Sequence, residues 1–126
     1  MSIKTAVVNG VATIEIARPE KKNALTVEMY QARADAINAA GENNAVRALL
    51  ITGQPGIFTS GNDLQDFLNR PRPHIDESPV FLFMRALISC DKPVVAAVTA
   101  VAMAPWARAG TRRSMATYRA TTKARP

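Results

Sequence analysis

The residues with the clearest capacity for chemistry form a turn, Ser60-Gly61-Asn62-Asp63-Leu64. The turn follows an apolar run at 46–52 that predicts a buried strand, and it precedes an amphipathic segment at 64–68 for which Asn62 and Asp63 are candidate caps. Glycine permits backbone conformations closed to other residues, and the next amide, that of Asn62, would lie near the positive end of the new helix. The turn could therefore hold a developing oxyanion, although the residues alone favour an ordinary capped strand-to-helix turn.

Two other reactive side chains invite a catalytic interpretation, and neither has the neighbours that it needs. Cys90 is the single cysteine, with no histidine nearby to activate it, so we expect a core or subsurface thiol. His74 is the single histidine and lies in a proline-rich loop at 69–79, so we expect a solvated side chain. No cysteine or carboxylate stands at ligand spacing from His74, and we expect no metal site.

The elements that would position the turn alternate between strands and helices, which indicates an α/β chain. Residues 5–16 predict two short strands joined at Asn9-Gly10, the strongest short hairpin signal. Thr26 can cap a helix that runs to about Ala40, and Gly41 would end it.

The second half of this pattern predicts another helix and another strand. Residues 80–89 predict a helix, and residues 93–101 predict a buried strand. We expect aromatic and sulfur side chains here to belong to the core rather than to a cofactor site. The apolar face of the helix would hold Phe81, Met84, Leu87 and Ile88.

Charge is distributed unevenly along the chain. The 126 residues carry a formal net charge of +6, and six of the 16 Lys and Arg residues lie at 104–126, where there is no acid. The first 103 residues are neutral, so any binding of nucleic acid or an acidic membrane would depend on the basic tail. No run of eighteen apolar residues and no signal-peptide core is present, so we expect no membrane span and a cytoplasmic location.

Four segments, in order and spacing, resemble the enoyl-CoA hydratase/isomerase (crotonase) family. They are Arg-Pro-Glu-Lys-Lys-Asn-Ala-Leu-Thr at 18–26, Ala-Leu-Leu-Ile-Thr-Gly at 48–53, Phe-Thr-Ser-Gly-Asn-Asp-Leu at 58–64 and Lys-Pro-Val-Val-Ala-Ala-Val at 92–98. The resemblance covers residues 1–103 and implies a crotonase-like spiral of ββα turns, truncated after about two turns. Members of the family assemble as trimers or hexamers, whereas half a spiral leaves core surface uncovered, which argues against independent folding.

The resemblance also implies a site. The backbone N–H of Asn62 would be the first of two donors that hold the thioester oxygen of an acyl-CoA as it becomes an enolate. Coenzyme A would be part of the substrate, with no separate cofactor. For the lysines of this site, a solvated charged loop is the alternative. The implied substrate-binding residues are Lys21, Lys22, Ala24, Ser60, Gly61, Asn62, Asp63, Leu64 and Gln65.

The second half of the implied site departs from the family pattern. Without gaps, the second donor position falls on Pro105, which has no N–H, and Arg108 takes the place of the first catalytic glutamate of hydratases. The chain ends before the second glutamate. Losing one oxyanion donor costs about a hundred- to a thousandfold in rate. We therefore expect no measurable turnover, and whether the chain is an enzyme, a hydratase or an isomerase stays open.

Three hypotheses remain for the whole chain. It is a truncated relative of these enzymes, a binding module that uses its basic tail on nucleic acid or acidic surfaces, or an inactive subunit of a crotonase oligomer. We favour the first, with an acyl-CoA thioester as partner. The tail, 104–126, has no aliphatic side chain larger than Ala except Met115, so we expect it to be disordered or weakly helical.

A reading-frame slip near the codons for 102–105 would explain the abrupt change of composition at the tail. When each codon starts at the third base of the one written, the codons of Pro105, Trp106 and Ala107 give Leu, Met or Val followed by Gly. The shifted frame thus restores a glycine beside the lost donor position, as the family pattern requires.

Overall fold

The computed structural model describes residues 2–70, 74, 77–98 and 116–120. Strands and helices alternate, as the sequence predicts. In chain order the elements are β1 (Ile3–Val8), β2 (Val11–Ile16), the short 3-10 helix η1 (Pro19–Lys21), α1 (Val27–Glu42), β3 (Ala48–Thr52), α2 (Leu64–Leu68), α3 (Pro79–Ser89), β4 (Val94–Val98) and β5 (Ala116–Ala120).

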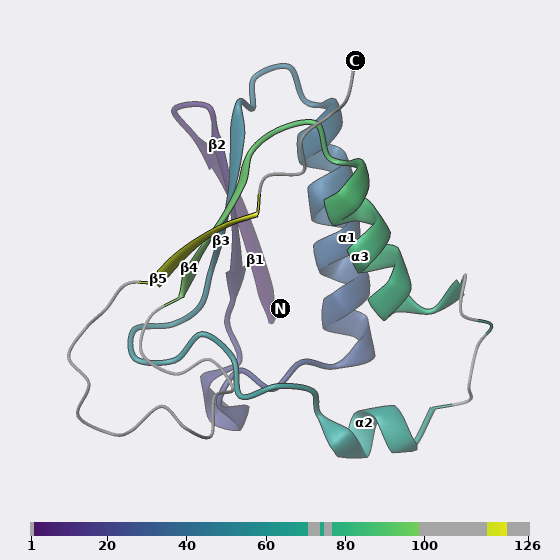
Figure 1. Ribbon diagram of the computed structural model, residues 1–126. Coiled ribbons are helices and arrows are strands. Elements are labelled where there is room, and N and C mark those ends of the chain that lie inside the picture. Colours follow the sequence, from purple (N-terminus) through teal and green to yellow (C-terminus); the bar gives the residue numbers. More distant parts are fainter. Residues whose placement is uncertain (1, 71–73, 75–76, 99–115, 121–126) are drawn as a thin grey trace.

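The strands form one sheet in the order β1-β2-β3-β4-β5. The pairs β1–β2 and β4–β5 are antiparallel, whereas β2–β3 and β3–β4 are parallel. Parallel neighbours need a crossover, and α1 supplies it between β2 and β3 while α2 and α3 supply it between β3 and β4. Helices α1 and α3 lie side by side over one face of the sheet (Figure 1), and the apolar core fills the space between the layers.

Local signals in the first half of the chain act as predicted, with one exception. The hairpin turns at Asn9 and Gly10, whose φ angles of 52° and 81° suit a tight turn between twisted strands. The Oγ1 of Thr26 accepts a 3.2 Å hydrogen bond from the Met29 N–H and caps α1. The prediction that Gly41 ends α1 is wrong, because the helix continues to Glu42.

The C-terminal end of α1 receives hydrogen bonds from a distant side chain. Lys92, two residues before β4, donates from Nζ to the carbonyl oxygens of Ala40 and Asn43, both at 2.7 Å. The same two carbonyl oxygens also accept from the backbone N–H groups of Asn43 and Val46, so Lys92 adds a charged donor to carbonyls that already have partners. The helix ends at Glu42 with Asn43 in the extended region, without a left-handed glycine.

The predicted apolar face of α3 packs on the core only in part: Leu87 is half-buried against it, and Phe83 bears out the expectation that aromatic side chains here belong to the core. Phe83 and Ala86 are buried, together with Cys90 just beyond the helix, whereas Met84 is 53% and Ile88 71% exposed. This helix carries apolar side chains all round, so their spacing alone could not choose the buried side. The prediction of a buried Cys90 thiol is confirmed.

The tail contains a strand, which corrects the prediction of disorder or weak helix for Ala116–Ala120. This strand pairs with β4 over its whole length, from Val94 opposite Ala120 to Val98 opposite Ala116. The free backbone groups along the edge of β4 can pair with another strand whatever its side chains are, so a segment poor in large apolar residues can still join the sheet. The rest of the tail, and 99–101 of the predicted strand 93–101, lie outside the described residues.

Two of the expected absences can be examined in the described part of the chain. None of its helices has the length and apolar character to cross a membrane. Nor do three His, Cys, Asp or Glu side chains gather there in a way that could hold a metal ion. His74 is exposed, as predicted.

Candidate functional site

In the turn between β3 and α2, the N–H groups on either side of Asn62 have acceptors within the protein, whereas that of Asn62 has none among the described residues. The Ser60 N–H donates to the Lys22 carbonyl oxygen at 3.1 Å, and the Asp63 N–H donates to the Leu25 carbonyl oxygen at 2.8 Å. The Gly61 N–H donates to the Oγ1 of Thr59 at 3.1 Å. Within residues 2–70, 74 and 77–98, the N–H of Asn62 has no acceptor.

The direction of this free N–H follows from the bond on the other side of the same peptide. The Gly61 carbonyl oxygen accepts a 2.8 Å hydrogen bond from the Leu25 N–H. Because a trans peptide is planar, its N–H points opposite to its C=O, so the Asn62 N–H points away from Leu25. Gly61 has a φ of 105°, a backbone conformation that residues other than glycine rarely adopt. The turn therefore presents a fixed, unsatisfied donor.

A buried asparagine ties the loop before α1 to the segment that leads into the turn. Asn23 is fully buried, and its Nδ2 donates to the carbonyl oxygens of Ile16, Ile57 and Phe58 at 3.1, 3.3 and 3.1 Å. Its Oδ1 accepts a 2.7 Å hydrogen bond from the Arg18 N–H. These bonds fix the loop at 18–25 beside the turn.

Asp63 has a structural role in the turn rather than that of an acid or base. Its Oδ2 accepts a 2.8 Å charge-assisted hydrogen bond from Arg18, and its Oδ1 caps α2 by accepting from the Asp66 N–H at 3.2 Å. The hydrogen bond from Arg18 holds the pKa of the Asp63 carboxyl below its usual range, and the bond from Asp66 acts in the same direction. A carboxylate so engaged stays ionised at neutral pH and links the loop to the turn.

The structure brings the other predicted site residues to the same region. Lys21 and Lys22 are exposed on the loop of η1, with Ala24 half-buried after them, and the backbone of Lys22 bonds to the turn. Ser60, Leu64 and Gln65 are exposed on the turn and on α2, and Leu64 is 73% exposed. Two exposed cations thus lie on the loop beside the turn, and an exposed leucine lies where α2 begins.

Sequence reasoning missed the side chains that hold the turn in place. Arg18 and Asn23 belong to the family-like segment at 18–26, and Tyr30 lies within the helix predicted after Thr26, but the sequence marks none of them as a site residue. In the structure the Tyr30 hydroxyl donates a 2.6 Å hydrogen bond to the Oδ1 of Asn62. A polar residue inside an otherwise structural motif could have suggested the role of Asn23, whereas no local signal marks Tyr30.

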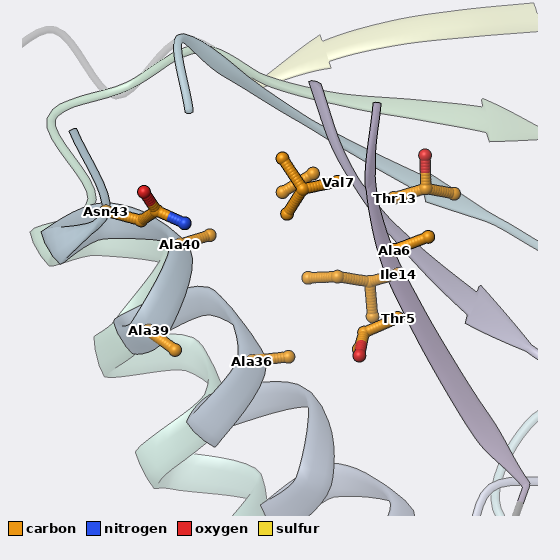
Figure 2. Close-up of a pocket in the computed structure, with 10 residues that line it drawn as sticks. Thr5, Ala6, Val7, Thr13, Ile14, Ala36, Ala39, Ala40 and Asn43 are labelled. Atoms are coloured by element: carbon orange, nitrogen blue, oxygen red, sulfur yellow. The ribbon is translucent and has the colours of Figure 1, made fainter. Parts of the chain in front are cut away.

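A separate cavity of about 330 Å³ lies between the C-terminal half of α1 and the β1–β2 hairpin (Figure 2). Tyr30, which contacts the turn, is on the N-terminal half of α1, so the cavity lies at the other end of this helix. None of its lining residues is acidic or basic, so it offers no charged group for chemistry. They are Thr5, Ala6, Val7, Ala12, Thr13, Ile14, Ala36, Ala39, Ala40 and Asn43.

Comparison with known proteins identifies the family. The family model for enoyl-CoA hydratase/isomerase matches residues 6–108. Among curated proteins, human enoyl-CoA delta isomerase 2 is 34% identical over 75% of this chain and 25% of its own length. The 1,2-epoxyphenylacetyl-CoA isomerase of Escherichia coli is 32% identical over 79% of this chain and 40% of its own length.

Solved structures agree with the sequence comparison. OdaA of Pseudomonas aeruginosa superimposes with a TM-score of 0.73 and 47% identity, over 77% of this chain and 39% of that one. A putative enoyl-CoA hydratase/carnithine racemase of Magnetospirillum magneticum gives a TM-score of 0.71 and 40% identity, over 77% and 38%. The chain thus spans less than half the length of these relatives. Its match over residues 6–108 shows that the chain belongs to the enoyl-CoA hydratase/isomerase family and has the crotonase fold.

Proposed function

We propose that the turn binds the thioester oxygen of an acyl-CoA through the backbone N–H of Asn62. The observation that carries this proposal is the pattern of hydrogen bonds: the N–H groups on both sides have acceptors inside the protein, and that of Asn62 has none in the described part. A fixed donor whose neighbours are satisfied is the arrangement that stabilises an oxyanion. The family acts on acyl-CoA thioesters, which supply such an oxygen.

The charges and apolar surface around the turn support the same ligand. The ammonium groups of Lys21 and Lys22 would meet the phosphates of coenzyme A, and they are exposed on the loop that bonds to the turn. The exposed Leu64 and its neighbour Gln65 would lie along the acyl part. Coenzyme A would arrive as part of the substrate, and the proposal requires neither a metal nor another cofactor.

We extend the proposal to binding without turnover by this chain. An enolate oxygen needs a second donor, and the gap-free family register places Pro105, which lacks an N–H, at that position. The same register places Arg108 where hydratases carry an acid–base glutamate, and such a group contributes about a hundred- to ten-thousandfold in rate. The Asn62 donor alone can still donate to the thioester oxygen of the bound ground state, whereas the enolate needs both donors and the reaction needs the acid–base group.

Binding can be tested with two glycine variants that strain the backbone to a similar degree. Gly61 and Gly56 both have positive φ, 105° and 86°, and a Cβ at Gly56 would meet nothing within 4 Å. Titration calorimetry with crotonyl-CoA should show that Gly61→Ala weakens binding at least tenfold, because it redirects the Asn62 N–H. Gly56→Ala should bind as the unmodified chain does. Equal effects of the two changes would contradict the proposal.

Turnover is tested separately. The purified chain, incubated with crotonyl-CoA and with a 3-enoyl-CoA, should leave both unchanged. Hydration or isomerisation at an ordinary enzymatic rate would overturn the proposal of binding without turnover and would mean that a second donor comes from another residue.

A further inference from the structure

The side chain of Asn62 makes a contact that the oxyanion site itself does not require. Its Oδ1 accepts a 2.6 Å hydrogen bond from the hydroxyl of Tyr30 on α1, 32 residues away in the sequence. Asn62 is exposed, so this contact was not forced on it by burial. The bond joins the turn to the helical layer directly at the residue whose N–H is free.

Tyr30 is itself held by packing against both of the other helices. Its ring meets Phe67 of α2 edge-on, with ring centroids 6.1 Å apart, and Phe83 of α3 at 5.6 Å. Such aromatic pairs fix ring orientation as well as adding to stability. Burial raises the pKa of the Tyr30 hydroxyl, so it stays protonated and able to donate at neutral pH, although the nearby Arg33 acts in the opposite direction.

The bond also fixes which end of the Asn62 amide faces Tyr30. A tyrosine hydroxyl that donates must meet the oxygen of the amide, which leaves the Nδ2 group free to turn away from Tyr30. In the described part of the chain this Nδ2 has no acceptor. The side chain and the backbone of Asn62 thus both keep donors unoccupied.

We propose that Tyr30 is a positioning residue for the oxyanion turn, which holds Asn62 through its side-chain oxygen so that the backbone N–H stays in one orientation. The backbone on both sides of Asn62 is already anchored, since the Gly61 carbonyl oxygen accepts from the Leu25 N–H and the Asp63 N–H donates to the Leu25 carbonyl oxygen, although Gly61 is the residue with the most permissive backbone. The Tyr30 bond restrains the residue next to that glycine. This inference rests on the proposed function for its ligand, but the restraint itself is a property of the free chain.

The test is a double-mutant cycle on the full chain, labelled with ¹⁵N. In Tyr30→Phe the ring and its packing on Phe67 and Phe83 remain while the hydroxyl is lost, and Tyr118→Phe makes the same chemical change in β5 as a control. We expect the order parameter of the Asn62 N–H to fall measurably below the rigid-backbone value of about 0.85 in Tyr30→Phe and to stay unchanged in the control. Asn62→Ala should give the same fall, and adding Tyr30→Phe to it should change nothing more.

Affinity for crotonyl-CoA gives the second readout. Tyr30→Phe should weaken binding about three- to tenfold, as expected for one lost hydrogen bond, and it should have no effect in the Asn62→Ala background. An unchanged Asn62 order parameter in Tyr30→Phe, or losses that multiply in the double variant, would overturn the positioning role. If the unmodified chain does not bind crotonyl-CoA, the proposed function fails, and the order parameters still decide the inference.

Discussion

Asn23 offers the sharpest test of how the site is held together. Its side chain satisfies the backbone N–H of Arg18 and carbonyl oxygens from two different segments, and it lies in the left-handed region with a φ of 56°. Asn23→Gly removes these bonds while keeping the backbone conformation accessible. Asn23→Ala removes the same bonds and adds backbone strain.

The magnitudes follow from these two contributions. A buried polar group left without a partner costs about 1–3 kcal/mol, and Asn23→Gly leaves at least the Arg18 N–H and the Phe58 carbonyl unpaired, so we expect a loss of about 3 kcal/mol. A non-glycine residue held in the left-handed region adds about 1–2 kcal/mol, so Asn23→Ala should lose about 4–5 kcal/mol. These losses are large beside a typical total stability of about 5–15 kcal/mol.

A second asparagine in the chain separates the two contributions. Asn9, in the hairpin turn, has a φ of 52° but is exposed. Asn9→Ala should therefore show the strain alone, about 1–2 kcal/mol. Free energies of unfolding come from urea titrations followed by circular dichroism, with the slope checked for each variant. A loss below about 1 kcal/mol in Asn23→Gly, or equal losses in Asn9→Ala and Asn23→Ala, would refute the reasoning.

Three further predictions follow from other parts of the chain. The hydrogen bond from Arg18 lowers the pKa of Asp63 below its ordinary 3.8. The stability that this pair contributes is therefore present above about pH 4 and is lost as pH falls through the lowered pKa. In Asp63→Asn, the free energy of unfolding measured in urea should depend less on pH below about pH 4. Arg33 is buried against Phe83, and burial lowers its pKa to about 10. Arg33→Met should therefore leave the free energy of unfolding unchanged or raise it by up to about 2 kcal/mol. A clear decrease in the free energy of unfolding would mean that the cation stabilises the fold. The reading-frame hypothesis for the tail predicts crotonase-like codons, including downstream carboxylates, in the shifted frame, and a stop there within a few codons would refute it when the gene is sequenced across codons 98–126.

The parts of the fold that the sequence predicts are those fixed by neighbouring residues. The hairpin at Asn9-Gly10, the Thr26 cap and the Asp63 cap each depend on residues within three positions of one another. The positive φ of Gly61 is equally local, and the structure confirms it. Such signals can be read because the physical cause and its effect lie in the same short segment.

The parts that the sequence did not predict depend on residues far apart in the chain. Lys92 donates to the last turn of α1 from 52 positions away, a contact that no local pattern marks. The buried side of α3 is chosen by its packing on α1, with the Phe83 ring 5.6 Å from that of Tyr30. Strand β5 joins the sheet through backbone pairing, which leaves no pattern of side chains to read.

In the candidate site, too, the sequence predicts the features that depend on neighbouring residues and misses those that depend on distant ones. The turn and its free Asn62 donor could be proposed from a glycine before a helix cap, whereas the bonds of Asn23 and Tyr30 join segments 35 and 32 positions apart. These distant bonds decide whether the donor is fixed or mobile. A sequence pattern can thus locate an oxyanion turn without showing what holds it.

The most direct test of the central claim is the amide proton shift of Asn62 during a titration with crotonyl-CoA. If the thioester oxygen accepts a hydrogen bond from this N–H, its proton resonance should move downfield to saturation. The resonances of Ser60 and Asp63 should move little, because their N–H groups already donate to Lys22 and Leu25. A saturable shift confined to other residues, or an Asn62 resonance that stays in place while crotonyl-CoA binds, would contradict the account.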